Sequence, residues 1–108
     1  MREEKEIWRD IPGYEGYFKV STKARILNML TKEIRHPGIS IHGYRHLVLR
    51  DGIGRRNWTV HLLVALTWCK RESDKHCEVH HKDFIKTNNE ARNLMWVTPY
   101  QHKQLHKK

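Results

Sequence analysis

Four of the nine histidines in this 108-residue chain have the spacing that metal binding and water activation require. His102 and His106 are four residues apart in a segment with a strong helix-start signal, so both imidazoles should project from one helix face. Such a pair is a common way to supply two nitrogen ligands to one metal ion. A third ligand must come from elsewhere in the chain, and His80 is the available candidate.

The adjacent histidines His80 and His81 end a segment that we expect to form a short strand. Neighbouring residues of a strand point to opposite faces, so the two imidazoles cannot face a metal ion in the same way, and we expect different roles for them. Each histidine pair alone is more typical of a solvated surface. The combination with Asn93, in the loop between the two pairs, favours a site. Asn88 and Asn89 are interpreted as turn residues, because asparagine suits left-handed backbone and local hydrogen bonds.

The elements that must position these residues follow one another in the second half of the chain. We expect them in this order: helix 60–68, strand 77–80, loop 83–93 and strand 94–97. Thr59 can cap the first helix. Thr98, Pro99 and Gln101 have the spacing of a capped helix start, and this last helix should run to about residue 107.

The first half of the chain has the pattern of short strands separated by glycine and proline. The expected strands are 17–21, 25–28, 44–50 and 56–60, in two antiparallel pairs. Asp51 and Gly52 suit the tight turn that joins the second pair. The pattern therefore predicts an antiparallel β module followed by a mixed α and β region.

The chain is strongly basic, with 21 lysines and arginines against 12 acidic residues and a net charge of +9. Residues 1–15 hold more acids than bases, so the positive charge comes entirely from residues 16–108. This concentration favours a polyanionic partner, most commonly nucleic acid. The best candidates for phosphate contacts are six basic side chains: Arg45, Arg50, Arg55, Arg56, Lys103 and Lys107.

Composition also argues against several classes of protein. No apolar run approaches the roughly 18 residues that a membrane-spanning helix needs, so no membrane partner is expected. Met1–Glu6 contain no apolar segment, and no secretory signal is expected. Cys69 and Cys77 do not form a disulfide framework, which favours a reduced, intracellular setting. The four tryptophans are interpreted as core residues, and Trp96 should pack on the helix expected over residues 60–68.

Three motifs of the second half occur together: Val79-His80-His81-Lys82-Asp83, then Asn93-Leu94-Met95-Trp96-Val97, then His102. In type and spacing they resemble the HNH endonucleases, and the similarity extends over residues 58–108. Separately, residues 7–21 resemble the small DNA-binding module at the front of many phage and intron-encoded HNH homing endonucleases. The resemblance implies an α+β fold, with an N-terminal antiparallel β module (residues 1–56) before a ββα-metal nuclease core (residues 57–108).

The resemblance also implies a role for each matched residue. His80 and His102 would be metal ligands, and His81 would be the general base that activates water. Asn93 would orient that base across the hairpin loop. His106 matches an additional helical ligand that only some branches of the family have.

The implied reaction is hydrolysis of DNA phosphodiester bonds, by nicking or by double-strand cleavage. A neutral imidazole with a pKa near about 6.5 can accept the proton of water at physiological pH. One divalent ion would stabilise the phosphorane and the leaving 3′ oxygen. An all-imidazole shell suits Zn, Ni, Co or Mn better than Mg, which prefers oxygen ligands. Asp83 is interpreted as holding the loop by local hydrogen bonds and not as a ligand.

Two other classes stay open beside a nuclease. One is a DNA-binding regulator that keeps the fold and does not cleave, against which the intact His80, His81, Asn93 and His102 argue. The other is a structural zinc module, which would leave His81 without a function. We expect DNA as the partner, a monomer or homodimer, and a location in the cytoplasm of a phage-infected bacterial host.

Overall fold

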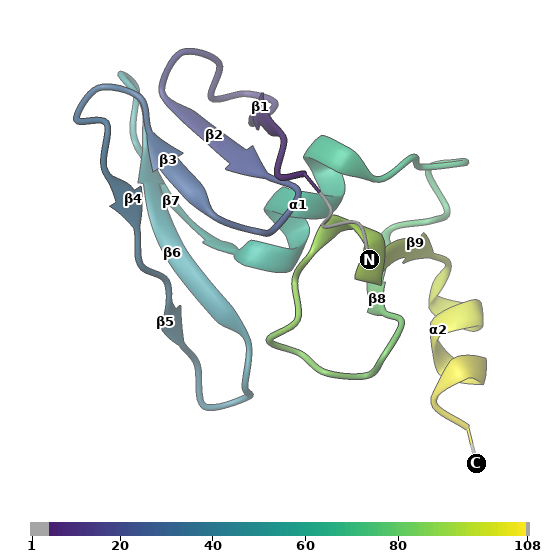
Figure 1. The fold of residues 1–108 in the computed structure, drawn as a ribbon. Helices are drawn as coiled ribbons and strands as arrows, with labels where there is room; N and C mark the ends of the chain where they lie inside the picture. The colour runs from purple at the N-terminus through teal and green to yellow at the C-terminus, as the bar shows by residue number, and fades with distance from the viewer. Residues whose placement is uncertain (1–4, 108) are drawn as a thin grey trace.

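Helix α1 (Val60–Trp68) is the element around which the chain is arranged in this computed structural model, which describes residues 5–107 (Figure 1). It contacts strands of all three sheets. Most of the helix is therefore covered, which explains why its apolar residues are not confined to one stripe.

Between residues 5 and 107, no helix is long and apolar enough to cross a membrane. The absence of a secretory signal was predicted from Met1–Glu6, of which residues 1–4 lie outside the described residues.

The predicted start of α1 is correct in position, but the predicted side-chain cap by Thr59 is not formed. Thr59 occupies the N-cap position with extended backbone angles, as a cap residue should. Within the described chain, its side chain makes no capping hydrogen bond, and its Oγ1 atom lies 3.4 Å from Nε2 of His61 instead. The helix is held by burial of its side chains and not by a cap.

The N-terminal region forms a four-stranded antiparallel sheet, in the order β1-β2-β3-β4. Its strands are β1 (Trp8–Asp10), β2 (Phe18–Ser21), β3 (Ile26–Asn28) and β4 (Ile34–Arg35). The predicted pairing of β2 with β3 is confirmed. The outer strands β1 and β4 were not predicted, because segments of two or three residues are defined by their partners and carry no period of their own.

A second antiparallel sheet contains β5 (Gly38–Ile39), β6 (Arg45–Arg50) and β7 (Arg55–Thr59). The predicted β6–β7 hairpin is confirmed, while β5 was not predicted. In the turn, Oδ1 of Asp51 accepts hydrogen bonds from the backbone N–H groups of Ile53 and Gly54. These bonds hold the pKa of Asp51 below its usual value, because they stabilise the carboxylate.

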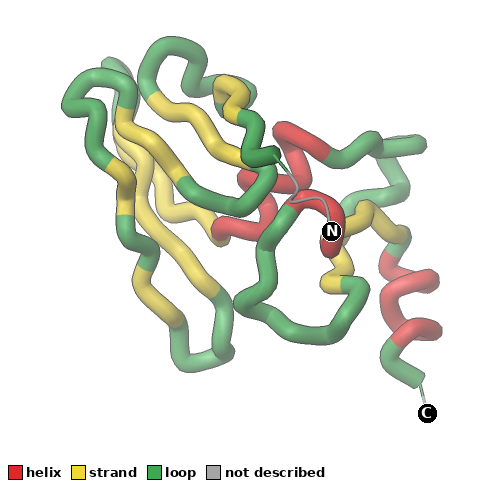
Figure 2. Tube along the Cα trace, in the orientation of Figure 1, coloured by secondary structure: helices red, strands yellow, loops and turns green. Residues whose placement is uncertain are grey.

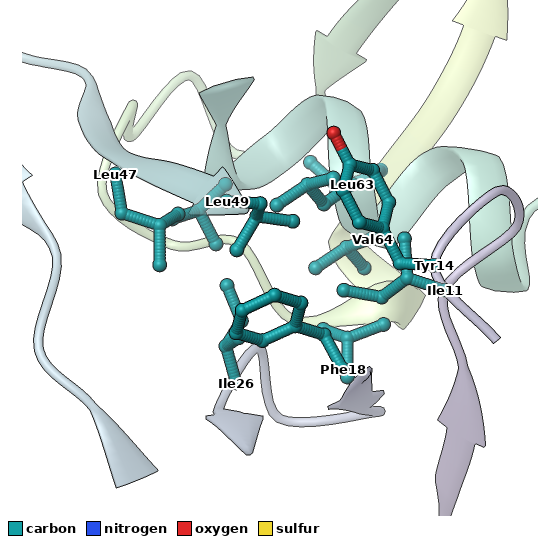
Figure 3. Packing of buried hydrophobic residues seen from close by; sticks show 11 residues of the cluster. Ile11, Tyr14, Phe18, Ile26, Leu47, Leu49, Leu63 and Val64 are labelled. Atoms are coloured by element: carbon teal, nitrogen blue, oxygen red, sulfur yellow. The ribbon is translucent and has the colours of Figure 1, made fainter. Parts of the chain in front are cut away.

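One hydrophobic core joins the N-terminal sheet, the β6–β7 hairpin and α1 (Figure 3). Hydrogen bonds also cross between the halves, from Nε1 of Trp58 to the Tyr14 hydroxyl (2.8 Å) and from Nε1 of Trp68 to the Val20 carbonyl (3.2 Å). The predicted boundary between residues 56 and 57 falls inside β7. The two predicted units therefore share their core, and the boundary itself stays a prediction.

The C-terminal region is a ββα arrangement, in which a long loop connects β8 to η1. Figure 2 shows this loop below the centre of the molecule. It comprises β8 (Glu78–His81), the short 3-10 helix η1 (Ala91–Asn93), β9 (Leu94–Val97) and α2 (Pro99–Leu105). Trp96 is buried and donates from Nε1 to the Ala65 carbonyl of α1, so its predicted packing is confirmed. The other three tryptophans are partly buried.

The predicted capping box of α2 is confirmed. Thr98 Oγ1 accepts from the Gln101 N–H, and the Gln101 side chain accepts from the Thr98 N–H. The helix ends at Leu105, two residues earlier than predicted, with His106 as its C-cap. The backbone N–H of His106 still bonds to the His102 carbonyl, which keeps the two imidazoles one turn apart on the same side.

Candidate metal centre

Strand β8 sends its two histidines into different surroundings. The ring of His80 faces the rings of His102, His106 and Phe84, with centroid distances of 5.6, 5.7 and 5.0 Å. The ring of His81 instead lies 5.1 Å from that of His61. The alternation expected from the strand period is therefore present.

The group that could hold a metal ion consists of His80, His102 and His106. One nitrogen from each imidazole lies within 4.8 Å of the others. The site is open on one side, because His80 is buried, His102 is half-buried and His106 is exposed. Burial lowers the pKa of His80, and the neighbouring His102 and His106 lower it further. A neutral imidazole is the form that binds metal, so these surroundings favour ligation.

Glu78 holds one of these imidazoles in place. Its Oε1 atom lies 2.9 Å from Nδ1 of His102. A carboxylate on one ring nitrogen orients the other nitrogen toward a metal and makes it a better donor. Glu78 was not among the predicted site residues, although it lies two residues before His80 and thus on the same face of the strand.

Phe84 covers the same group from the loop. Its ring centroid lies 5.0 Å from those of His80 and His106. Its backbone has a φ of +64°, in the left-handed region that bulky residues rarely adopt. Nothing in the sequence indicated this conformation, because phenylalanine has no preference for it.

The surroundings of His81 contain different partners. Its Nε2 atom lies 2.8 Å from Oδ1 of Asn89, and both side chains are buried. The ring of Tyr44 lies near both His61 and His81. Burial, with a smaller contribution from His81, lowers the pKa of His61 from 6.5 to about 4, so His61 stays neutral at physiological pH.

Asn93 fixes the loop and does not bond directly to His81 in the described residues. Its side-chain oxygen accepts from the Asp83 N–H, while its Nδ2 donates to Oδ1 of Asp83 and to the Asn88 carbonyl. The direct partner of His81 is Asn89, which we had interpreted as only a turn residue. That interpretation was wrong for Asn89. Its contact with His81 depends on the three-dimensional path of the loop between β8 and η1, which the local sequence does not indicate.

The network around Asp83 agrees with its predicted role in the loop. Besides Asn93, it accepts hydrogen bonds from the Asn88 side chain (2.7 Å) and the Ile85 N–H (2.9 Å). These bonds, led by that from Asn88, lower the pKa of Asp83. The loop between β8 and η1 is therefore tied to the base of the hairpin by one carboxylate.

The six basic candidates for phosphate contacts are all exposed and lie in three places. Lys103 and Lys107 line a groove of about 710 Å³ together with His102 and His106. Arg45 lines another groove, of about 680 Å³, beside Asn89. The remaining three, Arg50, Arg55 and Arg56, surround the β6–β7 turn, at the opposite end of the molecule from α2 (Figure 1).

This combination of a β hairpin, a following helix and a histidine group between them is the arrangement of the ββα-metal, or HNH, class. Comparison with known proteins agrees with it. Residues 6–50 match the NUMOD4 motif. DNA endonuclease I-HmuI of Bacillus phage SP01 is 37% identical over 92 residues, which are 84% of this chain and 52% of that protein. A solved structure of I-HmuI, titled as DNA binding and cleavage by this HNH homing endonuclease, superposes with a TM-score of 0.85. The identity there is 32%, over 92% of this chain and 56% of the other.

A second relative is the uncharacterized HNH endonuclease L247 of Acanthamoeba polyphaga mimivirus. It is 33% identical over 102 residues, which are 91% of this chain and 25% of that protein. Over most of its length the chain is thus similar to HNH homing endonucleases related to I-HmuI, and its N-terminal half contains a NUMOD4 motif. It spans about half the length of I-HmuI and a quarter of the mimivirus protein.

Proposed function

We propose that this chain is a metal-dependent DNA endonuclease of the homing type, which hydrolyses phosphodiester bonds. The observation that carries the proposal is that the two adjacent histidines of β8 lie in different surroundings. His80 belongs to an open group of three imidazoles whose ligand atoms lie within 4.8 Å, while the adjacent His81 has separate, buried surroundings. A metal ligand and a proton acceptor are the two functions that hydrolysis of a phosphodiester needs.

The residues present fit one divalent ion. His80, His102 and His106 would hold it, and their nitrogen donors suit Zn, Ni, Co or Mn better than Mg. When bound, such an ion would supply positive charge for the phosphorane and the leaving 3′ oxygen. Glu78 would orient His102 toward the ion.

His81 would act as the general base. It accepts a proton from a water molecule as that water attacks phosphorus, and the bond to the 3′ oxygen breaks on the opposite side. The Asp83–Asn93 network would hold the end of β8, and with it His81, in a fixed position. The 3′ oxygen leaves as an alkoxide and takes a proton from solvent water, so the products are a 5′ phosphate and a 3′ hydroxyl. The proton on His81 returns to solvent.

DNA would be held mainly through its phosphates. The molecule is 45 Å long in its largest dimension, which corresponds to about 13 base pairs at roughly 3.4 Å each. Basic residues at both ends, near α2 and at the β6–β7 turn, could therefore contact one duplex. We propose that the protein acts in the cytoplasm of an infected bacterial host, as a monomer or homodimer.

The experiment that tests the function is a plasmid-cleavage assay with and without added Mn²⁺, Ni²⁺, Zn²⁺ or Mg²⁺. Metal-dependent conversion of supercoiled plasmid to open circle would show nicking, and linear product would show double-strand cleavage. Binding of DNA without cleavage under every metal would favour a regulator. A metal-dependent rise in melting temperature with neither binding nor cleavage would favour a structural metal module.

The contribution of the basic residues can be measured separately, by fluorescence anisotropy over a salt series with the His81→Ala variant. Five phosphate contacts give a slope of log K against log salt of about −4 to −5. Changing Arg55 and Arg56 to Gln should flatten it by about 2 and weaken binding to all sequences. The control is the same charge change at Lys70 and Lys75, in the loop after α1. Equal effects of the two double variants would contradict a local contact at the β6–β7 turn.

A further inference from the structure

We propose that Asn89 is a positioning residue that fixes the tautomer of His81, with the proton on Nε2 and the free electron pair on Nδ1. The inference rests on the proposed role of His81 as general base. It assigns the accepting atom within that imidazole and the residue that selects it.

The first step is the hydrogen bond between the two side chains. Oδ1 of Asn89 lies 2.8 Å from Nε2 of His81. An amide oxygen can only accept, so the neutral imidazole must carry its proton on Nε2 to make this bond. His81 is 7% exposed and Asn89 4% exposed, so water competes little for either atom. Breaking the bond would leave a buried polar atom without a partner, which is unfavourable.

The second step concerns the other ring nitrogen. Across residues 5–107, the side-chain nitrogen and oxygen atoms that are fully buried and lack a hydrogen-bond partner comprise one atom, Nδ1 of His61. Nδ1 of His81 makes no hydrogen bond in the same part of the chain and is not among the fully buried atoms without a partner, so it keeps some surface exposed to solvent. It is therefore the nitrogen that a water molecule can reach.

The third step is what holds Asn89. On one side, the carbonyl of Asn88 accepts from Nδ2 of Asn93, at 2.8 Å. On the other side, the N–H of Ala91 donates to the carbonyl of Thr22, in the turn between β2 and β3, also at 2.8 Å. The backbone on both sides of Asn89 is thus anchored, once to the hairpin and once to the N-terminal sheet. A fixed amide can select a tautomer, whereas a mobile one would follow the imidazole.

The consequence for the reaction is specific. Nδ1 takes the proton from the attacking water, and the resulting imidazolium keeps its Nε2–H bond to Asn89. No other side chain among the described residues bonds to His81, so Asn89 is the group that prevents the proton from resting on the nitrogen that must accept. A histidine with the wrong tautomer has no electron pair to offer at that atom.

The tautomer can be measured without DNA or metal. Nitrogen-15 NMR of the labelled, metal-free chain at alkaline pH separates the two nitrogens of a neutral imidazole, because the unprotonated nitrogen resonates far downfield of the protonated one. The His81→Ala spectrum assigns the signals of His81. We expect the Nε2–H form in the wild type, a mixture of both forms in Asn89→Ala, and the Nε2–H form again in Asn89→Asp, whose carboxylate also accepts.

Thr87→Ala is the matched control, because Thr87 is an exposed residue of the same loop, two positions before Asn89. It should leave the tautomer of His81 unchanged. With Asn89→Ala, the cleavage rate should fall about 10-fold, a part of the 10²–10⁴ that a general base contributes, and Asn89→Asp should restore much of it. An Nδ1–H form in the wild type, or an unchanged tautomer in Asn89→Ala, would overturn the assignment. A wild-type chain that shows the Nε2–H form but cleaves no DNA would overturn the proposed function alone.

Discussion

The two faces of strand β8 differ in exposure, in partners and in the kind of chemistry they support. On one face, His80 meets two further imidazoles, and the group opens to solvent through His106. On the other face, His81 is enclosed by His61 and Asn89, with one hydrogen bond that fixes its orientation. Two identical side chains, adjacent in sequence, thus acquire different properties from the surfaces they face.

The difference teaches that a ligand group and a proton acceptor need opposite kinds of support. An open site lets a metal ion keep free positions toward a phosphate. A proton acceptor needs a fixed tautomer and a fixed direction, which a buried amide provides. Substitutions on the His80 face should therefore act on metal affinity, and substitutions on the His81 face should act on rate at saturating metal.

The largest expected effect comes from His81→Ala. Cleavage should fall by a factor on the order of 10²–10⁴, because His81 is the proposed general base. Metal affinity should stay nearly unchanged, because the metal group lies on the other face. The measurement is plasmid cleavage at saturating metal beside a calorimetric metal titration. Equal cleavage by variant and wild type would refute the assignment of His81.

The next effect should come from His102→Ala. At a metal concentration about 100 times the Kd, binding stabilises the fold by about 2.7 kcal/mol, on the order of 10 °C in melting temperature for a domain of this size. His102→Ala should abolish most of this metal-dependent rise. His106→Ala should reduce it less, because His106 lies at the exposed C-cap. Unchanged metal affinity in His106→Ala would show that His106 is not a ligand.

A smaller loss is expected from Glu78→Gln. The glutamine keeps the size of the side chain and removes the carboxylate that holds His102, so metal affinity should fall about 10-fold, at the lower end for outer-shell partners. The matched control is Glu72→Gln, because Glu72 is an exposed acid 4.0 Å from a histidine outside the site. If both variants bind metal equally, Glu78 has no orienting role.

A different kind of effect, on neither metal affinity nor rate, should come from His61→Leu, through the pH dependence of stability. The pKa of His61 is about 4 in the folded chain and near its ordinary 6.5 when unfolded. Between these values the unfolded chain binds a proton that the folded chain does not, so acidification favours unfolding. The variant should lose less melting temperature than the wild type as pH falls from about 6.5 to about 4. His80 is present in both proteins, so any effect of His80 is the same in both. If the melting temperatures of variant and wild type fall in parallel as the pH is lowered, His61 does not contribute to the pH dependence of stability.

Local patterns in the sequence were sufficient to predict much of the fold. The capping box at Thr98 and the alternation at His80 and His81 depend on neighbours in sequence, and both were predicted. β1, β4 and β5 were missed because their residues form strands only when a longer strand pairs with them.

Part of the candidate site was equally beyond local reasoning. The contact between Asn89 and His81 depends on how the loop folds back, and the enclosure by His61 and Tyr44 joins residues far apart in sequence. By contrast, Glu78 could have been found from strand alternation alone. The useful lesson is that polar residues two positions from a candidate ligand should be considered with it.

The hydrogen bond from the Ala91 N–H to the Thr22 carbonyl also bears on how this protein can be recombined. It joins a turn of the NUMOD4 region to the loop that carries Asn89, and the shared core adds Val20 and Tyr14 to the same boundary. Under the proposed function, an N-terminal half taken from a relative would bring new DNA contacts, but it would also have to supply a carbonyl at the same place and the same apolar neighbours. Target preference and catalytic competence would then be inherited together, and exchange of one without the other should give a chain that folds with a misaligned His81.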